Sequence, residues 1–170
     1  TGRELWSVKP RTDGDFNVPT PVVVGDKLLV ATENNGGRLY AFNNDGTINP
    51  EHVAVNTKLN PQMSTPVAVG DRIFCVNHRL ECFDAANGLR STWAARDRTF
   101  CEYGAAIASS DRLLVQGRGG EMVLVDAASA TIQSFTYDDT GAGWHPTTDG
   151  GGRSLVILNP SGALANWSSG

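Results

Sequence analysis

The sequence of 170 residues predicts an all-β chain, a β-propeller of four-stranded antiparallel blades. The heptapeptide Thr-Pro-Val-Val-Val-Gly-Asp at residues 20–26 returns at 65–71 and, more loosely, at 105–111. A second, apolar landmark begins at residues 39, 80, 122 and 164, which are 41, 42 and 42 residues apart. A period near forty, with short alternating strands inside each unit, is typical of propeller blades.

The first two complete units each contain four short apolar runs, separated by turn signals such as Gly-Asp and Asn-Gly. In the blade of residues 18–60 we expect strands at 21–24, 27–32, 38–42 and 53–58, with an insertion around residue 49. In the blade of residues 61–100 we expect strands at 66–69, 72–76, 79–83 and 90–94.

The remaining chain continues the same plan but ends one strand short. In the blade of residues 101–138 we expect strands at 106–108, 112–116, 121–125 and 131–135. The partial blade of residues 139–170 supplies strands at 146–148, 153–158 and 163–167. Residues 1–10 are predicted to provide its fourth strand, because their Thr-Gly-Arg-Glu-Leu-Trp sequence matches the last strand of the second blade. Pairing of this kind removes an open strand edge.

This closure makes the chain a single domain of four blades, and it leaves three assemblies open. The chain is a four-bladed monomer, half of an eight-bladed homodimer, or a piece cut from a longer ring. We expect the homodimer, because blades of this size pack more comfortably at seven or eight per ring and because two-fold closed oligomers are common.

Composition excludes some partners. The net charge of −4 argues against nucleic acid and anionic membrane surfaces as partners, since both are negatively charged. No apolar run approaches the roughly twenty residues of a membrane span. Three cysteines leave at least one thiol unpaired. A two-residue turn at Asn77-His78 would place Cys75 and Cys82 on the same face as diagonal neighbours, and we expect both to be buried free thiols.

Five residues carry a resemblance to a known family. Residues 82–93, Cys-Phe-Asp-Ala-Ala-Asn-Gly-Leu-Arg-Ser-Thr-Trp, resemble the repeat of the PQQ-like (quinoprotein-type) β-propellers, and residues 1–6 and 124–126 resemble its second half and its start. The resemblance implies that a tryptophan of the last strand stacks on the neighbouring blade and that an aspartate ties the turn before it. The matching positions here are Trp6, Asp84, Gly88, Trp93 and Asp126.

The resemblance implies two kinds of function. Some members are dehydrogenases that use pyrroloquinoline quinone (PQQ) with calcium, and many are binding or scaffold modules without a cofactor. The chain lacks the adjacent cysteine pair of many of the enzymes. We therefore expect a non-catalytic module with no cofactor and no metal, binding a protein or a small molecule. The alternatives are a fragment of a PQQ-dependent dehydrogenase and a carbohydrate-binding propeller. The resemblance also implies an extracytoplasmic location, periplasmic or secreted, in a bacterium.

The candidate binding residues lie in the connections that lead from one blade to the next, because such loops gather on one face of a propeller. A carbohydrate ligand would use the aromatic side chains among them, whereas His52 and His78 are expected to be surface turn residues. The candidates are Asn17, Gln62, Met63, Glu102, Tyr103, Trp144 and His145.

Overall fold

The structure is a computed structural model that describes residues 2–15 and 17–128, together with the backbone of 131–136, 155–157 and 167–169. Residues 1–134 and 135–170 form two compact units. Within the described part of the chain the only helical element is the short 3-10 helix η1 (Arg98–Phe100). No helix among those residues is long and apolar enough to cross a membrane.

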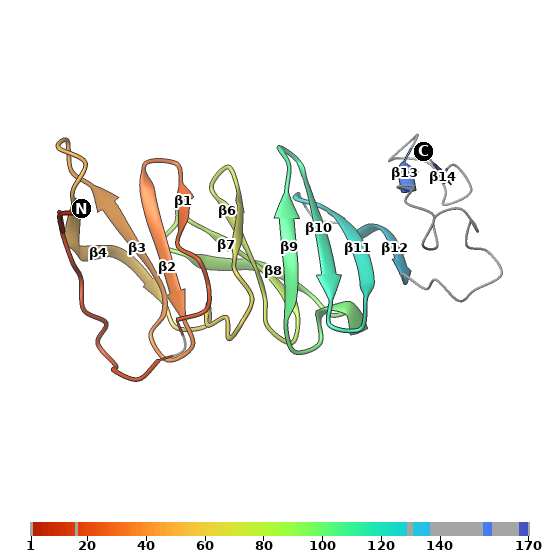
Figure 1. The fold of residues 1–170 in the computed structure, drawn as a ribbon, viewed down its shortest axis with the longest axis horizontal. Coiled ribbons are helices and arrows are strands. Elements are labelled where there is room, and N and C mark those ends of the chain that lie inside the picture. Colours follow the sequence, from red (N-terminus) through yellow and green to blue (C-terminus); the bar gives the residue numbers. More distant parts are fainter. Residues whose placement is uncertain (1, 16, 129–130, 137–154, 158–166, 170) are drawn as a thin grey trace. The chain divides into compact units, whose positions relative to one another are not determined.

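Three four-stranded antiparallel sheets follow one another along the chain, each with its strands in sequence order (Figure 1). The first sheet contains β1 (Val22–Val24), β2 (Lys27–Thr32), β3 (Gly36–Phe42) and β4 (Ile48–Asn56). The second contains β5 (Val67–Val69), β6 (Arg72–Val76), β7 (Leu80–Asp84) and β8 (Arg90–Ala95). The third contains β9 (Gly104–Ala108), β10 (Arg112–Gly117), β11 (Glu121–Asp126) and β12 (Thr131–Thr136).

These sheets confirm the all-β class and the four-stranded antiparallel units, whereas closure into a ring stays a prediction. In the second unit, β13 (Leu155–Ile157) pairs with β14 (Trp167–Ser169). The residues predicted as an insertion around residue 49 belong to β4, which begins at Ile48 and not near residue 53. Two irregularities in its pairing with β3 absorb the extra length, and an edge strand tolerates the missing proline N–H.

The sheets pack face to face through two buried apolar clusters. Since side chains alternate along a strand, β6 contributes Ile73 and Cys75 to the cluster shared with the first sheet. Its other two apolar residues, Phe74 and Val76, enter the cluster shared with the third sheet. The centre of the second sheet is therefore buried on both faces, which explains why β6 is apolar without interruption from Ile73 to Val76.

The turn between β6 and β7 is longer than predicted. Val76 pairs with Leu80, so the turn contains three residues, and His78 adopts a positive φ of 56°. One extra residue moves every following side chain to the opposite face. Cys82 therefore lies across from Phe74, on the face opposite Cys75, and the prediction that the two cysteines share a face is wrong. Both are buried free thiols, as expected.

Residues 2–10 form no strand. Their predicted partner strands lie in residues 139–170, most of which fall outside the described residues, so this pairing is untested. Trp6, Val8 and Pro10 instead border a small cavity of about 160 Å³ over the outer face of the first sheet, beside Leu28 and Tyr40.

The segment that follows is fixed to the turn between β2 and β3. The amide of Asn35 donates to Asp15 Oδ2 at 2.7 Å, and the backbone N–H of Asn34 donates to Asp15 Oδ1 at 2.9 Å. Desolvation raises the pKa of Asp15, but hydrogen bonds, among them those from Asn34 and Asn35, outweigh it and lower the pKa to about 2. The carboxylate is thus a structural hydrogen-bond acceptor of this turn.

Candidate functional site: a basic pocket beside the blade connections

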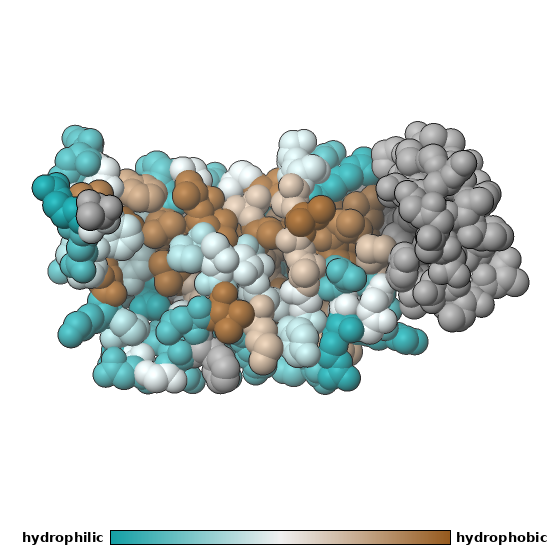
Figure 2. Space-filling model, viewed as in Figure 1, coloured by the Kyte–Doolittle hydropathy of each residue, from teal (hydrophilic) through white to brown (hydrophobic). Residues whose placement is uncertain are grey.

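The connections between blades lie along one edge of residues 1–134. The backbone N–H of Thr20 donates to Thr65 Oγ1 at 3.1 Å, and the backbone N–H of Gly104 donates to Ser64 Oγ at 3.0 Å. Each bond joins the start of one blade to the start of the next. Figure 2 shows apolar residues gathered over the strands, while the edge formed by the connections is mostly hydrophilic.

Five of the predicted binding residues lie in these connections. Asn17 is exposed, and its amide donates to the Asp15 carbonyl at 3.1 Å. Met63 is 51% exposed, while Gln62 and Tyr103 are half-buried.

The fifth residue, Glu102, has a backbone role as well as an ion pair. Its carboxylate pairs with Arg118, and its carbonyl accepts the backbone N–H of His78 at 3.1 Å. Glu102 adopts a positive φ of 69°. Trp144 and His145 lie outside the described residues.

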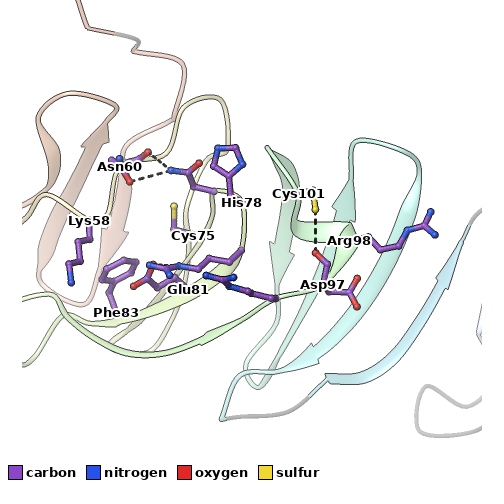
Figure 3. Close-up of a pocket in the computed structure, with 12 residues that line it drawn as sticks. Lys58, Asn60, Cys75, His78, Glu81, Phe83, Asp97, Arg98 and Cys101 are labelled. Carbon is purple, nitrogen blue, oxygen red and sulfur yellow. Dashed lines mark hydrogen bonds and ion pairs between the residues drawn. The ribbon is translucent and has the colours of Figure 1, made fainter.

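A pocket of about 650 Å³ lies on this edge, close to these residues but formed by others (Figure 3). Its wall comes from the end of the first blade, from the β6–β7 turn and from the connection that contains η1. The lining residues are Lys58, Asn60, Cys75, Asn77, His78, Arg79, Glu81, Phe83, Arg96, Asp97, Arg98 and Cys101.

A buried carboxylate organises one wall of the pocket. Glu81 is 8% exposed, and its Oε2 lies 2.9 Å from Arg79 Nη2 and 3.0 Å from Arg79 Nε. Its Oε1 accepts the hydroxyl of Ser91 at 2.7 Å. Both carboxylate oxygens are therefore hydrogen-bonded inside the protein. These bonds offset the desolvation cost of burying the charge, and they hold Arg79 in place.

An amide on the facing wall has an unused acceptor. Asn77 Nδ2 donates to the Asn60 carbonyl at 3.1 Å and to Asn60 Oδ1 at 3.2 Å. These two bonds fix the orientation of the amide, and its Oδ1 is buried without a partner among the described residues. A buried acceptor without a donor is costly, and a ligand N–H or O–H would bind this closed-off atom once neighbouring side chains move aside.

The pocket is basic although the chain is acidic. Four of its lining side chains are Lys or Arg and two are carboxylates, a formal surplus of two positive charges in a chain of net charge −4. Arg79 is committed to Glu81, and Arg98 lies 3.3 Å from Glu121. Lys58 and Arg96 form no ion pair with any described residue. These two cations are available to an anionic ligand.

The Cys75 thiol, which lines the pocket, is a poor nucleophile. Burial, and to a smaller extent the negative charge of Glu81, raise the pKa of the Cys75 thiol to about 12. Cys75 is therefore protonated at neutral pH, and the thiolate is the reactive form. Cys101 is exposed and donates weakly to the Asp97 carbonyl at 3.8 Å. No cluster of three His, Cys, Asp or Glu side chains suited to a metal ion occurs among the residues described.

Sequence reasoning missed most of this pocket. It named His78, but as a surface turn residue, and it did not consider Arg79, Glu81 or Arg96. The only available signal was the pair of arginines, Arg96 and Arg98, in the connection after the second blade. The pocket forms because three separate loops meet, and because the three-residue turn moves Glu81 to the face that carries Cys75.

The two aspartates of the family motif lie at the turns before the last strand of their blades. Asp84 Oδ1 accepts the backbone N–H groups of Ala86 at 2.9 Å and Asn87 at 3.3 Å. Asp126 Oδ1 accepts the backbone N–H of Ala128 at 2.6 Å in the next blade. Both aspartates thus occupy equivalent positions before the last strand.

The other motif residues differ in their surroundings. Gly88 adopts a positive φ of 66°, a conformation that favours glycine. The Trp93 ring packs against Phe74 with centroids 5.8 Å apart, toward the third blade. Trp6 is 41% exposed over the first sheet.

Repeated four-stranded blades that pack through their faces place the chain in the β-propeller class. Residues 1–142 match the model of the PQQ_2 family, described as "Outer membrane protein assembly factor BamB". The chain belongs to this family of PQQ-like repeats.

Among solved structures, the crystal structure of BamB from Moraxella catarrhalis is similar to this chain at 16% sequence identity and a TM-score of 0.42. The similarity covers 67% of this chain and 38% of that one, so the chain spans well under half of the solved protein. No curated protein matches the sequence.

Proposed function

We propose that this chain is a non-catalytic binding or scaffold module of a PQQ-like β-propeller that acts in outer membrane protein assembly, outside the cytoplasm. The match of residues 1–142 to a family described as an outer membrane protein assembly factor carries the proposal. The edge of blade connections supports it, because loops on a rigid scaffold are common binding surfaces. Fold by itself does not assign function. The basic pocket beside the connections therefore serves as the second argument for a binding role.

No cofactor is part of this proposal. The protonated Cys75 thiol and the structural commitment of Glu81 leave these two pocket groups without a catalytic role. Under the alternative of a PQQ-dependent dehydrogenase, adding PQQ with calcium would produce quinone absorbance and alcohol oxidation, and Glu102→Ala or Asn17→Ala would abolish that turnover. Under the carbohydrate alternative, glycan binding would disappear when Tyr103 and Trp144 are both replaced by alanine.

The oligomeric state that we propose for the chain is based on the outer face of the first sheet. That face presents Leu28, Val30, Tyr40 and Ile48, and the first ten residues give it a partial cover. We propose that a further blade covers it in a closed ring, with two copies of the chain making eight blades. A native mass spectrum tests this: twice the chain mass is expected, and a single-chain mass at micromolar concentration would refute the homodimer.

The function is tested in the bacterium that encodes the chain. Deleting its coding sequence should reduce the amount of folded β-barrel protein in the outer membrane, measured by heat-modifiable migration on gels, and a plasmid copy should restore it. Fractionation should place the chain outside the cytoplasm. Unchanged amounts of folded β-barrel proteins after deletion would refute the role in assembly.

A further inference from the structure

We propose that the basic pocket binds an acidic peptide segment of a partner protein in extended conformation. The inference rests on the proposed function as a protein-binding module, and it goes further by naming the site and the chemistry of the ligand. Three properties of the pocket carry it: its free cations, its unused amide acceptor and its size.

The free cations favour a negatively charged ligand. Lys58 and Arg96 have no ion-pair partner among the described residues, although the chain as a whole is acidic. Glu81 does not neutralise them, because both of its carboxylate oxygens are already occupied by Arg79 and Ser91. Asp97 lies on the same wall, but its Oδ1 accepts the backbone N–H of Thr99 at 2.9 Å and caps η1.

The amide of Asn77 would accept a hydrogen bond from the same ligand once neighbouring side chains move aside from its Oδ1. Its Oδ1 is buried and unpartnered, and the two bonds to Asn60 prevent the amide from turning its NH₂ group toward the pocket. An ionised carboxylate or a sulfate offers no hydrogen for this atom. A peptide offers a backbone N–H beside an acidic side chain, so it satisfies both groups at once.

The size and openness of the site suit a short segment. A volume of about 650 Å³ lies within the range of about 300–1,000 Å³ that ligand pockets occupy. The walls come from three loops on one edge, so a chain can enter and leave the pocket along that edge (Figure 3). An extended segment presents alternate side chains to one wall, which fits a ligand that alternates acidic and neutral residues.

The test is fluorescence anisotropy with a fluorescein-labelled peptide that alternates glutamate and threonine over about ten residues. The matched peptide carries glutamine in place of each glutamate. The double variant Lys58→Gln/Arg96→Gln removes the two free cations, and Arg3→Gln/Arg90→Gln removes two exposed cations that do not line the pocket. Both variants therefore have the same net charge, and thermal unfolding verifies that both are folded.

Binding of the glutamate peptide, but not the glutamine peptide, is expected at low salt. We expect Lys58→Gln/Arg96→Gln to weaken it about fivefold to thirtyfold, as two partly screened ion pairs would, and the matched variant to change it by less than about twofold. Equal losses in the two variants, or equal binding of the two peptides, would overturn the inference. Binding of an oligonucleotide or a sulfated oligosaccharide in place of the glutamate peptide would overturn it too.

The deletion experiment separates this inference from the proposed function. If the deletion strain loses folded outer-membrane proteins and Lys58→Gln/Arg96→Gln restores them as fully as the wild-type chain, the pocket inference is refuted while the assembly role stands. If deletion has no effect but the peptide binds as described, the assembly role is refuted and the pocket stands.

Discussion

Replacing Phe83 by alanine tests whether adjacent blades depend on one another for stability. Phe83 is 0% exposed and lies opposite Ile73 on the second sheet. It belongs to the cluster that also contains Leu29 and Leu39 of the first sheet. The side chain therefore fills space between two blades, and the hydrogen-bonded strands on either side restrict how far that space can collapse.

The expected cost follows from this burial. Truncation of a fully buried phenylalanine to alanine destabilises a protein by about 3–5 kcal/mol. A domain of this kind has a total unfolding free energy of about 5–15 kcal/mol, so the loss is a large share of it. With a urea m-value of about 2 kcal/mol per molar, the unfolding midpoint should fall by about 2 M.

The assay is urea unfolding followed by far-ultraviolet circular dichroism. Phe42→Ala is the matched control, because it removes the same atoms from a side chain that is 39% exposed on β3. Its midpoint should fall by about 0.5 M or less, since surface substitutions rarely exceed 1 kcal/mol. Equal shifts for the two variants, or a shift below about 0.5 M for Phe83→Ala, would refute the packing argument.

Three further predictions use single residues. At pH 8 in native conditions, DTNB should label one thiol per chain rapidly, that of Cys101, because Cys75 and the other buried cysteine are shielded; rapid labelling of two or three thiols would contradict this. Because the pKa of Asp15 is lowered to about 2 from 3.8, its stabilising contribution is present above pH 4 and is lost as the pH falls toward 2. The melting-temperature gap between wild type and Asp15→Asn should therefore narrow from pH 4 to pH 2, and a constant gap would refute the linkage. Gly117→Ala should lower the melting temperature by about 3–10 °C, since its Cβ would lie 2.5 Å from the Thr99 carbonyl oxygen; a change of under 1 °C would show that the backbone yields easily.

Repetition made the architecture predictable from sequence. A period of about 42 residues sets the blade, and the alternation of side chains along each strand determines which of them are buried. For example, Ile73 and Phe74 are neighbours in sequence but enter the two different clusters. These features depend on local geometry. Because each blade repeats the same pattern of strands and turns, one chain shows that pattern several times.

The candidate site was less predictable, since it depends on contacts between distant loops. Two of the predicted connections do meet, since the backbone N–H of Gly104 donates to Ser64 Oγ, while their role as a binding face stays a prediction. The pocket itself needs Lys58 from one blade and Arg96 from the end of the next, and no spacing in the sequence relates them.

The sequence by itself determined the repeat, the blade and the alternation of buried faces, because each is encoded within about forty consecutive residues. Only the tertiary structure decided the length of the turn at His78 and, with it, the face on which Glu81 and Cys82 lie. The physical reason is that one added turn residue reverses the facing of a whole strand. Packing between sheets selects the register that buries Phe83 on one side and Cys82 on the other.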